Sequence, residues 1–290
     1  MNLDILLIQF LNGLVISMLL FLTAAGLSLI LGLMDVVNLV HGSSYLLGGY
    51  FGLTVLRQTD SFWLALIIAP IFTALLGLLI ERIFLQRLYL KGHLHQVLFT
   101  FGLALVAADL MRWNWGSHVQ SIPTPQLFAG TVQIAGMGFP IYRLAILAIG
   151  LVLAASLWFL IEQTRIGAIV RAGVADSQMV DALGINIQRV FAAVFALGTG
   201  LAALAGVLAA PIPNLYPGQD FEILLLAMVV VVVGGLGTIK GAFWGAIIIG
   251  MADTFAKARL PEISVFVIFL IMALVLLIQP SGLMGTRKLT

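Results

Sequence analysis

The sequence contains no cysteine and few charged residues. The absence of cysteine from all 290 residues excludes a disulfide scaffold, a thiolate metal site and thiol catalysis. Charged residues make up 9% of the chain, against about a quarter in average soluble domains. Hydrophobic residues make up 62%, enough for about eight spanning helices at about 20 apolar residues each. The apolar runs are continuous and do not alternate as in a β-barrel, so we expect an all-α polytopic membrane protein.

The sequence also lacks the motifs of common catalytic and nucleotide-binding sites. It contains no His-Glu-x-x-His, no Gly-x-Ser-x-Gly and no Gly-x-x-x-x-Gly-Lys-Ser/Thr. Its four histidines do not have the spacing of a metal cluster. The net charge of +2 fits basic cytoplasmic loops better than a nucleic-acid footprint. We therefore expect no enzymatic activity, no metal or cofactor bound by this chain and no nucleic-acid partner.

Eight or nine apolar segments follow one another, and we treat 1–290 as a single transmembrane domain. They cover Ile5–Leu33, Val36–Leu56, Phe62–Ile80, Leu94–Met111, Tyr142–Ile161, Val190–Ala210, Phe221–Val233, Gly241–Phe255 and Ile263–Ile278. The seventh is short and is followed by Gly234, Gly235 and Gly237, so 221–240 is predicted to be a tilted span or a broken, re-entrant segment. Glycine-rich helices followed by polar or broken segments occur in both halves, which suggests an internal repeat.

Basic residues orient the segments. They concentrate in the loops 81–95 and 162–189 and at the C-terminus, as Arg82, Arg87, Lys91, Arg165, Arg171, Arg189, Arg287 and Lys288. The positive-inside bias places these regions in the cytoplasm. The N-terminus is then outside for nine crossings and inside for eight. The loop 113–140, with a hairpin expected at Thr131–Gly138, is extracytoplasmic and is either a lid or a docking surface.

Polar residues in or beside the spans are candidates for a solute pathway, because they are costly in lipid. Asn38, His41 and Ser44 recur at intervals of three in the second segment, which predicts one helical face, and Thr100 in the fourth raises the same question. The alternative is hydrogen bonding between helices. Among the acids, Asp35 and Asp220 are expected at segment ends, Asp109 near the outer surface, and Asp253 in an i,i+4 pair with Lys257.

The inner loop 162–189 is expected to contain a short amphipathic helix. Small and apolar residues recur there at spacings of three and four, at Ala168, Ala172, Ala175, Met179, Ala182 and Leu183. Such a helix either lies at the lipid interface or packs into a groove of another protein.

Several stretches, in order along nearly the whole chain, resemble the permease subunits of branched-chain amino acid ABC transporters of the LivH type. They are GLSLILGLMDVVNLVHGSSYLLGGY with its Asn-x-x-His-Gly signature, ERIFLQRL followed by TFGLAL, TRIGAIVRAGVADSQMVDALGI, GGLGTIKGAFWGAIIIG and QPSGLMG. The set is specific although no single motif is decisive.

The resemblance implies a subunit of an ATP-driven importer in the bacterial cytoplasmic (inner) membrane, with a cytoplasmic C-terminus. Its partners would be a second homologous permease, two ATP-binding subunits that hold the ATP, and an extracytoplasmic solute-binding protein that docks on 113–140 and on the Pro211–Asp220 turn. The residues implied in ATPase coupling are Arg165, Gly167, Arg171, Ala172, Asp181 and Gly184. The cargo (an amino acid, amide or urea) and the choice between heterodimer and homodimer stay open.

A stand-alone secondary transporter or channel is the alternative to an importer subunit. It would need coupling carboxylates or a selectivity filter near the membrane midplane. The sequence offers few such groups.

Overall fold

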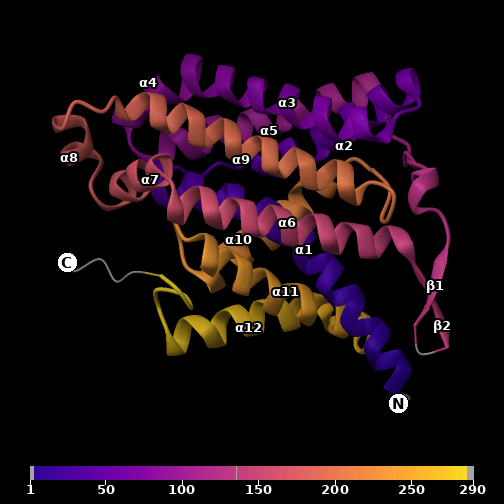
Figure 1. Ribbon diagram of the computed structural model, residues 1–290. Coiled ribbons are helices and arrows are strands. Elements are labelled where there is room, and N and C mark those ends of the chain that lie inside the picture. The colour runs from indigo at the N-terminus through magenta and orange to yellow at the C-terminus, as the bar shows by residue number, and fades with distance from the viewer. Residues whose placement is uncertain (1–2, 135, 286–290) are drawn as a thin grey trace.

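The computed structural model describes residues 3–134 and 136–285. Within these residues, nine long helices form an elongated bundle (Figure 1). They are α1 (Leu3–Met34), α2 (His41–Thr59), α3 (Phe62–Ile80), α5 (His93–Trp115), α6 (Ile141–Gln163), α9 (Ile187–Ala209), α10 (Gln219–Gly234), α11 (Ile239–Arg259) and α12 (Ser264–Ile278). Each apolar segment of the sequence coincides with one of them, so the all-α polytopic fold is confirmed.

Short elements connect the long helices. They are η1 (Glu81–Leu85), α4 (Gln86–Leu88), η2 (Tyr89–Lys91), η3 (Gln126–Phe128), β1 (Thr131–Ile134), β2 (Met137–Pro140), α7 (Arg165–Ala175), α8 (Ser177–Ala182) and η4 (Pro261–Ile263). Strands β1 and β2 pair antiparallel, with Thr131 opposite Pro140. The hairpin expected at this position is therefore confirmed for the residues that the structure describes.

In the part of the chain that the structure describes, seven helical stretches are long and apolar enough to cross a membrane on their own. The two long helices outside this set are α2 and α10. Helix α2 is too polar, since it begins with histidine, glycine and serine, and α10 has only 16 residues. Both are instead largely covered by other helices, which allows polar or short helices at membrane depth.

Side-chain caps fix where several helices begin. Ser61 accepts a hydrogen bond from the Leu64 amide at the start of α3, and Thr238 accepts one from the Gly241 amide at the start of α11. Such caps satisfy backbone donors that have no partner within the helix. The Thr238 cap ends a tight turn, because only four residues separate α10 from α11.

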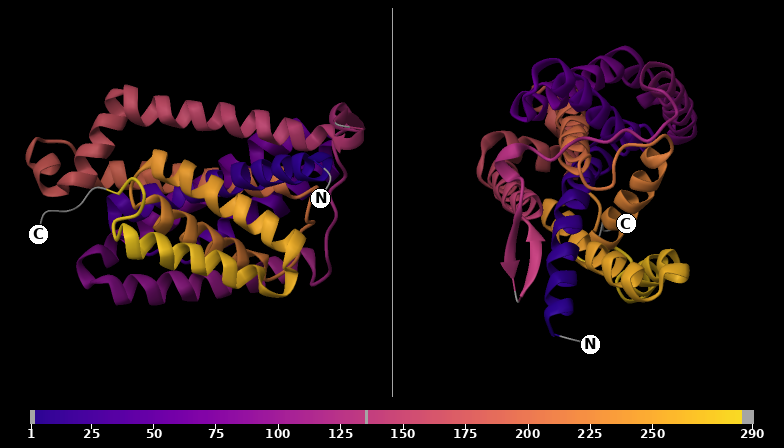
Figure 2. Two further views of the ribbon diagram at one scale, coloured as in Figure 1. Left: turned by 90° about the horizontal axis from the view of Figure 1, so that it is seen from below. Right: turned by 90° about the vertical axis from the view of Figure 1, so that its right-hand side faces the viewer.

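Helix α1 is the centre of the bundle and packs against α9 and α11. Figure 2 (right) looks along the bundle from the hairpin end and shows α1 between the α2–α3 group and the α11–α12 pair. Gly26 and Gly198 lie at the α1–α9 crossing, where a Cβ on Gly26 would stand 2.5 Å from the Gly198 carbonyl oxygen. Without a hydrophobic effect between helices in lipid, such close backbone contact is a main source of packing energy.

The helix contacts of the two halves match in pairs. Helix α1 packs against α11, as α9 packs against α3; α2 packs against α9, as α10 packs against α1. The group α1, α2 and α3 and the group α9, α10 and α11 each begin with a long helix, and in each group the second helix starts inside the bundle. This pattern is the one an inverted repeat produces, and it supports the repeat suggested by the glycine distribution.

The two ends of the bundle differ in what they carry. The start of α1 and the β1–β2 hairpin lie at one end, and α7 and α8 lie at the other (Figure 1). When α2 and α10 are counted, the nine long helices of the described residues alternate in direction from α1 to α12, as the nine-crossing alternative requires. Arg287 and Lys288, used to orient the C-terminus, lie outside the described residues.

Candidate solute pathway and coupling surface

Helix α2 begins inside the bundle and not at its end. Helix α1 ends at Met34, residues 35–40 return along it without regular structure, and α2 starts at His41. The His41 Nε2 lies 2.9 Å from the carbonyl oxygen of Thr23. Along α1, Thr23 lies roughly 16 Å before the helix end at Met34, at 1.5 Å per residue, so α2 starts well inside the bundle. A carbonyl can only accept, so Nε2 donates and Nδ1 is left as a bare acceptor.

This start corrects the predicted polar face of the second segment. Asn38 precedes the helix, so Asn38, His41 and Ser44 do not lie on one helical face. His41 points to α1, whereas Ser44 donates its hydroxyl to the Val40 carbonyl oxygen 3.3 Å away. Sequence periodicity missed the break because the residues on both sides of it are compatible with a helix.

Helix α10 also begins inside the bundle, beside α2. The loop 210–218 leads from the end of α9 to Gln219, and the Ser43 hydroxyl donates to Asp220 Oδ2 at 3.1 Å. Asp220 is 2% exposed. Its expected place at a segment end is therefore half right: it begins a helix, but that helix begins in the interior.

Of the two alternatives for 221–240, a tilted span or a broken, re-entrant segment, the described residues do not show the break at the glycine-rich turn after α10. Helix α10 is continuous to Gly234, and Gly237 of the following turn packs against Gly32 near the end of α1. The irregular backbone lies before the helix, in 210–218. Irregular backbone is tolerated at such depth where protein or a wet cavity surrounds it.

Polar atoms without partners gather around the two helix starts. They are both amide atoms of Asn38, His41 Nδ1, Gln219 Oε1 and Asp220 Oδ1, none of which has a hydrogen-bond partner in the described part of the chain. Buried polar groups are normally paired, so unpaired ones need an explanation such as a ligand or water. Five such atoms at two interrupted helices make this the polar centre of the bundle, and we call Asn38, His41, Ser43, Gln219 and Asp220 the interior polar cluster.

Ser43, Gln219 and Asp220 were not among the pathway residues predicted from the sequence. The available signal was the break PIPNLYP just before Gln219, because a polar pair between such a break and an apolar run marks a helix start. Its partner on α2 was hidden among neighbouring serines and glycines. Only the packing of α10 on α2 selects Ser43.

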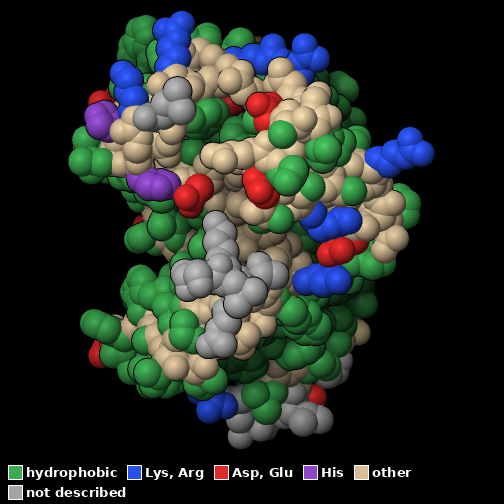
Figure 3. Space-filling model, turned by 90° about the vertical axis from the view of Figure 1, so that its left-hand side faces the viewer, with side chains coloured by type: hydrophobic (Ala, Val, Ile, Leu, Met, Phe, Trp, Pro, Cys, Tyr) green, Lys and Arg blue, Asp and Glu red, His purple; other side chains and the backbone are tan. Residues whose placement is uncertain are grey.

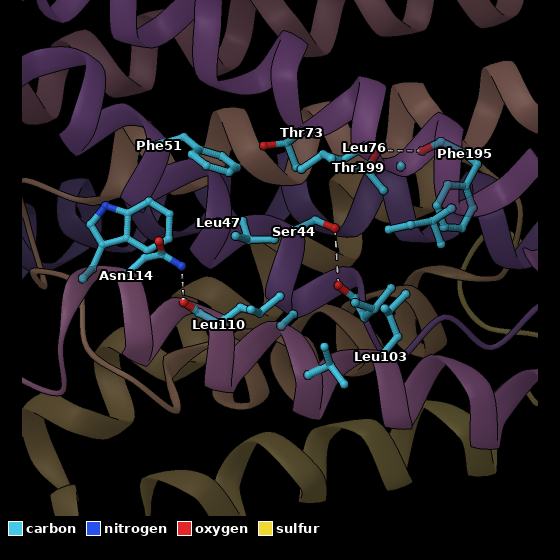
Figure 4. Close-up of a pocket in the computed structure, with 16 residues that line it drawn as sticks. Ser44, Leu47, Phe51, Thr73, Leu76, Leu103, Leu110, Asn114, Phe195 and Thr199 are labelled. Atoms are coloured by element: carbon cyan, nitrogen blue, oxygen red, sulfur yellow. Dashed lines mark hydrogen bonds between the residues drawn. The ribbon is translucent and has the colours of Figure 1, made fainter. Parts of the chain in front are cut away.

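Two predicted pathway residues, Ser44 and Thr100, are not part of the interior polar cluster. Ser44 lines a groove of about 350 Å³ between α2, α3, α5 and α9 (Figure 4). The hydroxyls of Ser44, Thr73 and Thr199 in this groove donate to carbonyls of their own helices, so the groove is effectively apolar. The Thr100 hydroxyl lies 3.1 Å from the Val37 carbonyl oxygen and helps to hold the irregular segment 35–40. Their pathway role stays a prediction.

A second, smaller cavity of about 170 Å³ lies on the hairpin side of the cluster, between α1, α2, α10 and α11. Its lining includes Thr23, Gln219, Glu222 and Tyr216. The Tyr216 hydroxyl donates to Glu222 Oε2 at 2.8 Å. Burial, and next the hydrogen bond to the Glu222 carboxylate, raise the pKa of Tyr216 to about 12, so this phenol remains a neutral donor at physiological pH.

The loops at the hairpin end are joined to each other. Gln120 in the loop 113–140 and Leu215 in the loop 210–218 exchange two backbone hydrogen bonds of 2.8 and 2.9 Å. Arg57, in the last turn of α2, donates to the Gln120 side chain at 2.8 Å. The two segments that the resemblance assigned to one external partner thus form a continuous surface.

At the other end, α7 and α8 replace the single amphipathic helix that was expected. The helix breaks at Asp176, whose carboxylate caps α8 by accepting from the Met179 amide at 2.9 Å. Thr164 caps α7 through the Gly167 amide at 3.1 Å. The predicted stripe remains on the surface, because Ala168, Ala172, Ala175, Met179, Ala182 and Leu183 are all exposed.

Most of the predicted coupling residues lie on this surface. Arg165, Arg171, Ala172, Asp181 and Gly184 are exposed, and Figure 3 shows this end of the molecule with Lys and Arg side chains gathered on it beside hydrophobic ones. Gly184, with φ of +83°, ends the α8 segment in a conformation that favours glycine. We call the exposed faces of α7 and α8 the inner platform.

Gly167 is an exception among them, because it is buried. A Cβ at this position would collide with the Ile161 carbonyl oxygen, and Gly173 one and a half turns later packs against Leu33. These glycines fasten α7 to α6 and α1. Gly167 therefore supports the platform from inside, and its role in ATPase coupling stays a prediction.

The comparisons with known proteins agree with this architecture. Residues 9–276 match the family model described as branched-chain amino acid transport system / permease component. The chain belongs to this family. The permease is 29% identical, over 96% of its length and 95% of the relative's, to the high-affinity branched-chain amino acid transport system permease protein BraD of Pseudomonas aeruginosa. It is 28% identical, over 96% and 94%, to the corresponding protein LivH of Escherichia coli.

More distant relatives share only part of the permease. The ribose import permease protein RbsC of Haemophilus influenzae is 30% identical over 56% of this chain and 51% of its own. No solved structure matches. Family membership and the membrane-spanning helices make the chain a multi-pass inner-membrane transport subunit and not an enzyme. Membership also favours an importer subunit over a stand-alone transporter or channel.

Proposed function

We propose that this permease forms the translocation pathway of an ATP-driven importer for branched-chain amino acids. The observation that supports it most directly is the meeting of two interrupted helices at Ser43 and Asp220 inside the bundle. Discontinuous helices whose starts face a midplane site are the way many transport folds bind and release a solute. The names of the relatives supply the cargo class.

The two ends of the bundle fit two different partners. The inner platform presents Arg165, Arg171 and an exposed stripe of small residues, which suits close docking into a groove of an ATP-binding subunit. The joined loops 113–140 and 210–218 suit an extracytoplasmic solute-binding protein. The proposed assembly holds two ATP-binding subunits and a second, homologous permease, with ATP bound by the partners and the C-terminus of this chain in the cytoplasm.

Reconstitution tests the proposal. The purified complex of both permeases and the ATP-binding subunits is placed in liposomes with leucine-loaded binding protein outside. We expect ATP hydrolysis to rise several-fold with loaded protein and leucine uptake to require ATP. Uptake driven by a proton gradient without ATP would instead support a secondary transporter, for which the interior carboxylate Asp220 would be the coupling group.

A further inference from the structure

The cavity on the hairpin side of the interior polar cluster has an unusual lining for a gap between helices. It holds about 170 Å³ and reaches Thr23, the residue whose carbonyl accepts from His41. A solute entering from the hairpin end through this cavity would therefore arrive at the start of α2. The cavity is small, against about 300–1,000 Å³ for sites of drug-sized ligands, so it fits one small solute.

Charges of both signs face this cavity. Lys257 Nζ lies 2.8 Å from Asp253 Oδ2, and Asp253 is 4% exposed. Glu222 also lines the cavity, with one carboxylate oxygen accepting from Tyr216. Among the described residues that line it there are two carboxylates and one cation, so beyond the Lys257–Asp253 pair the lining carries one further acidic group, the exposed Glu222.

An unpaired acceptor lies next to that charge. Gln219 is 3% exposed; its amide nitrogen donates to the Asn214 carbonyl oxygen at 3.3 Å, whereas Oε1 has no partner within the described chain. Gln219 and Glu222 are three residues apart on α10, so both project from one side of that helix. Gln219 Oε1 is itself buried and not open to the cavity. The Glu222 carboxylate does face the cavity, and it favours a ligand that brings several N–H donors, as an ammonium group does.

Most of the remainder of the wall is aliphatic, with Tyr45 of α2 and Tyr216 as the aromatic members. It is formed mainly by Ile16, Leu19, Leu20, Ile212, Ile223 and Leu226. A branched alkyl side chain gains contact with such a wall, whereas a charged or strongly polar side chain would lose hydration there.

We propose that this cavity is a transient binding site for one zwitterionic α-amino acid with an aliphatic side chain. The ammonium group lies against the Glu222 carboxylate, the carboxylate lies against Lys257, and the alkyl group lies on the aliphatic wall. This inference rests on the proposed function and adds the recognition chemistry within the permease itself. The cargo is then checked once more after it leaves the binding protein.

A single engineered cysteine tests the site, because the chain has no cysteine of its own. Ile223→Cys in the assembled transporter is labelled with a small thiol reagent, and the labelling rate of this subunit is read after gel separation. We expect L-leucine to slow labelling several-fold, with 3-methylbutylamine (no carboxylate) and 4-methylpentanoate (no ammonium) each protecting at least tenfold more weakly. Leu103→Cys, in the groove of Figure 4, is the control and should be unprotected.

Charge variants in the Ile223→Cys background test the assigned contacts. Glu222→Gln should raise the leucine concentration for half-protection about tenfold, the loss expected for one charge-assisted hydrogen bond. Glu262→Gln, an exposed acid in η4 away from the cavity lining, should leave it unchanged. Equal protection by all three compounds, no protection by leucine, or equal effects of the two glutamate variants would overturn the site.

Uptake separates failure of the site from failure of the proposed function. The cysteine-free transporter is assayed for ATP-dependent leucine uptake in the same preparation. Uptake without leucine protection of Ile223→Cys refutes the cavity site alone. Absence of both uptake and protection refutes the importer on which the site rests.

Discussion

The hydrogen bond between Ser43 and Asp220 joins the two interrupted helices, and its energy can be measured. We expect Ser43→Ala to destabilise the permease because it leaves a carboxylate that is 2% exposed without its described donor. Hydrogen bonds to charged groups contribute about 1.5–3 kcal/mol in soluble proteins, but coupling energies in a membrane protein average about 0.6 and reach about 1.7 kcal/mol. We therefore expect a coupling of about 1 kcal/mol in the double-mutant cycle with Asp220→Asn.

The assay is unfolding of the purified full-length permease by SDS titration in mixed micelles, followed by circular dichroism. Ser43→Ala should cost about 1 kcal/mol more when residue 220 is aspartate than when it is asparagine, because a neutral amide is less costly to leave unpaired. Ser44→Ala is the matched control. The Ser44 hydroxyl donates to the carbonyl oxygen of Val40, four residues earlier in the chain, so the effect of this substitution should not depend on residue 220. Equal costs of Ser43→Ala in both backgrounds would refute a direct bond.

Three further predictions concern packing and the inner platform. Gly206→Val should sharply lower the yield of folded permease in size-exclusion chromatography, because a Cβ there would collide with the Tyr45 carbonyl oxygen, whereas Gly102→Val, with no described heavy atom within 4 Å of its Cβ position, should be tolerated. Arg171→Glu should abolish ATP-dependent uptake while leaving membrane insertion intact, and Arg171→Lys should restore part of it; normal uptake by the glutamate variant would reject a coupling role. Asp176→Ala should destabilise α8 by about 0.5–2 kcal/mol, seen as faster amide hydrogen exchange over 177–182, and Asp176→Asn should retain the cap.

The predictions from the sequence were most accurate where one physical property decides the outcome. Long apolar runs must form helices in a membrane because each backbone polar group needs a partner, and all nine marked segments are helices. The pair of Asp253 with Lys257 and the hairpin depend on contacts between residues close in sequence, and both were confirmed. The amphipathic stripe was also recognised, although its break at Asp176 was not.

Errors arose where contacts between distant segments decide the structure. The start of α2 was placed before Asn38, because nothing local forbids a helix there; the hydrogen bond from His41 to Thr23 and the contact of Thr100 with Val37 fix the break. Gly167 was assigned to ATPase coupling, a role that stays a prediction; only the fold shows that its lack of a side chain allows α7 to approach Ile161.

Hydropathy, charge and motif order were enough to show that this chain is a bundle of apolar helices, which of its ends is basic, and to which family it is similar, because these properties need no knowledge of the fold. Only the tertiary structure placed Asp220 beside Ser43, 177 positions away in the chain, and put Gln219, Glu222 and Lys257 around one cavity. The physical reason is that a polar residue at a helix start is ordinary at a membrane surface and costly inside it. Whether that start lies at the surface or in the interior depends on how α1, α2, α10 and α11 pack, which no local pattern records.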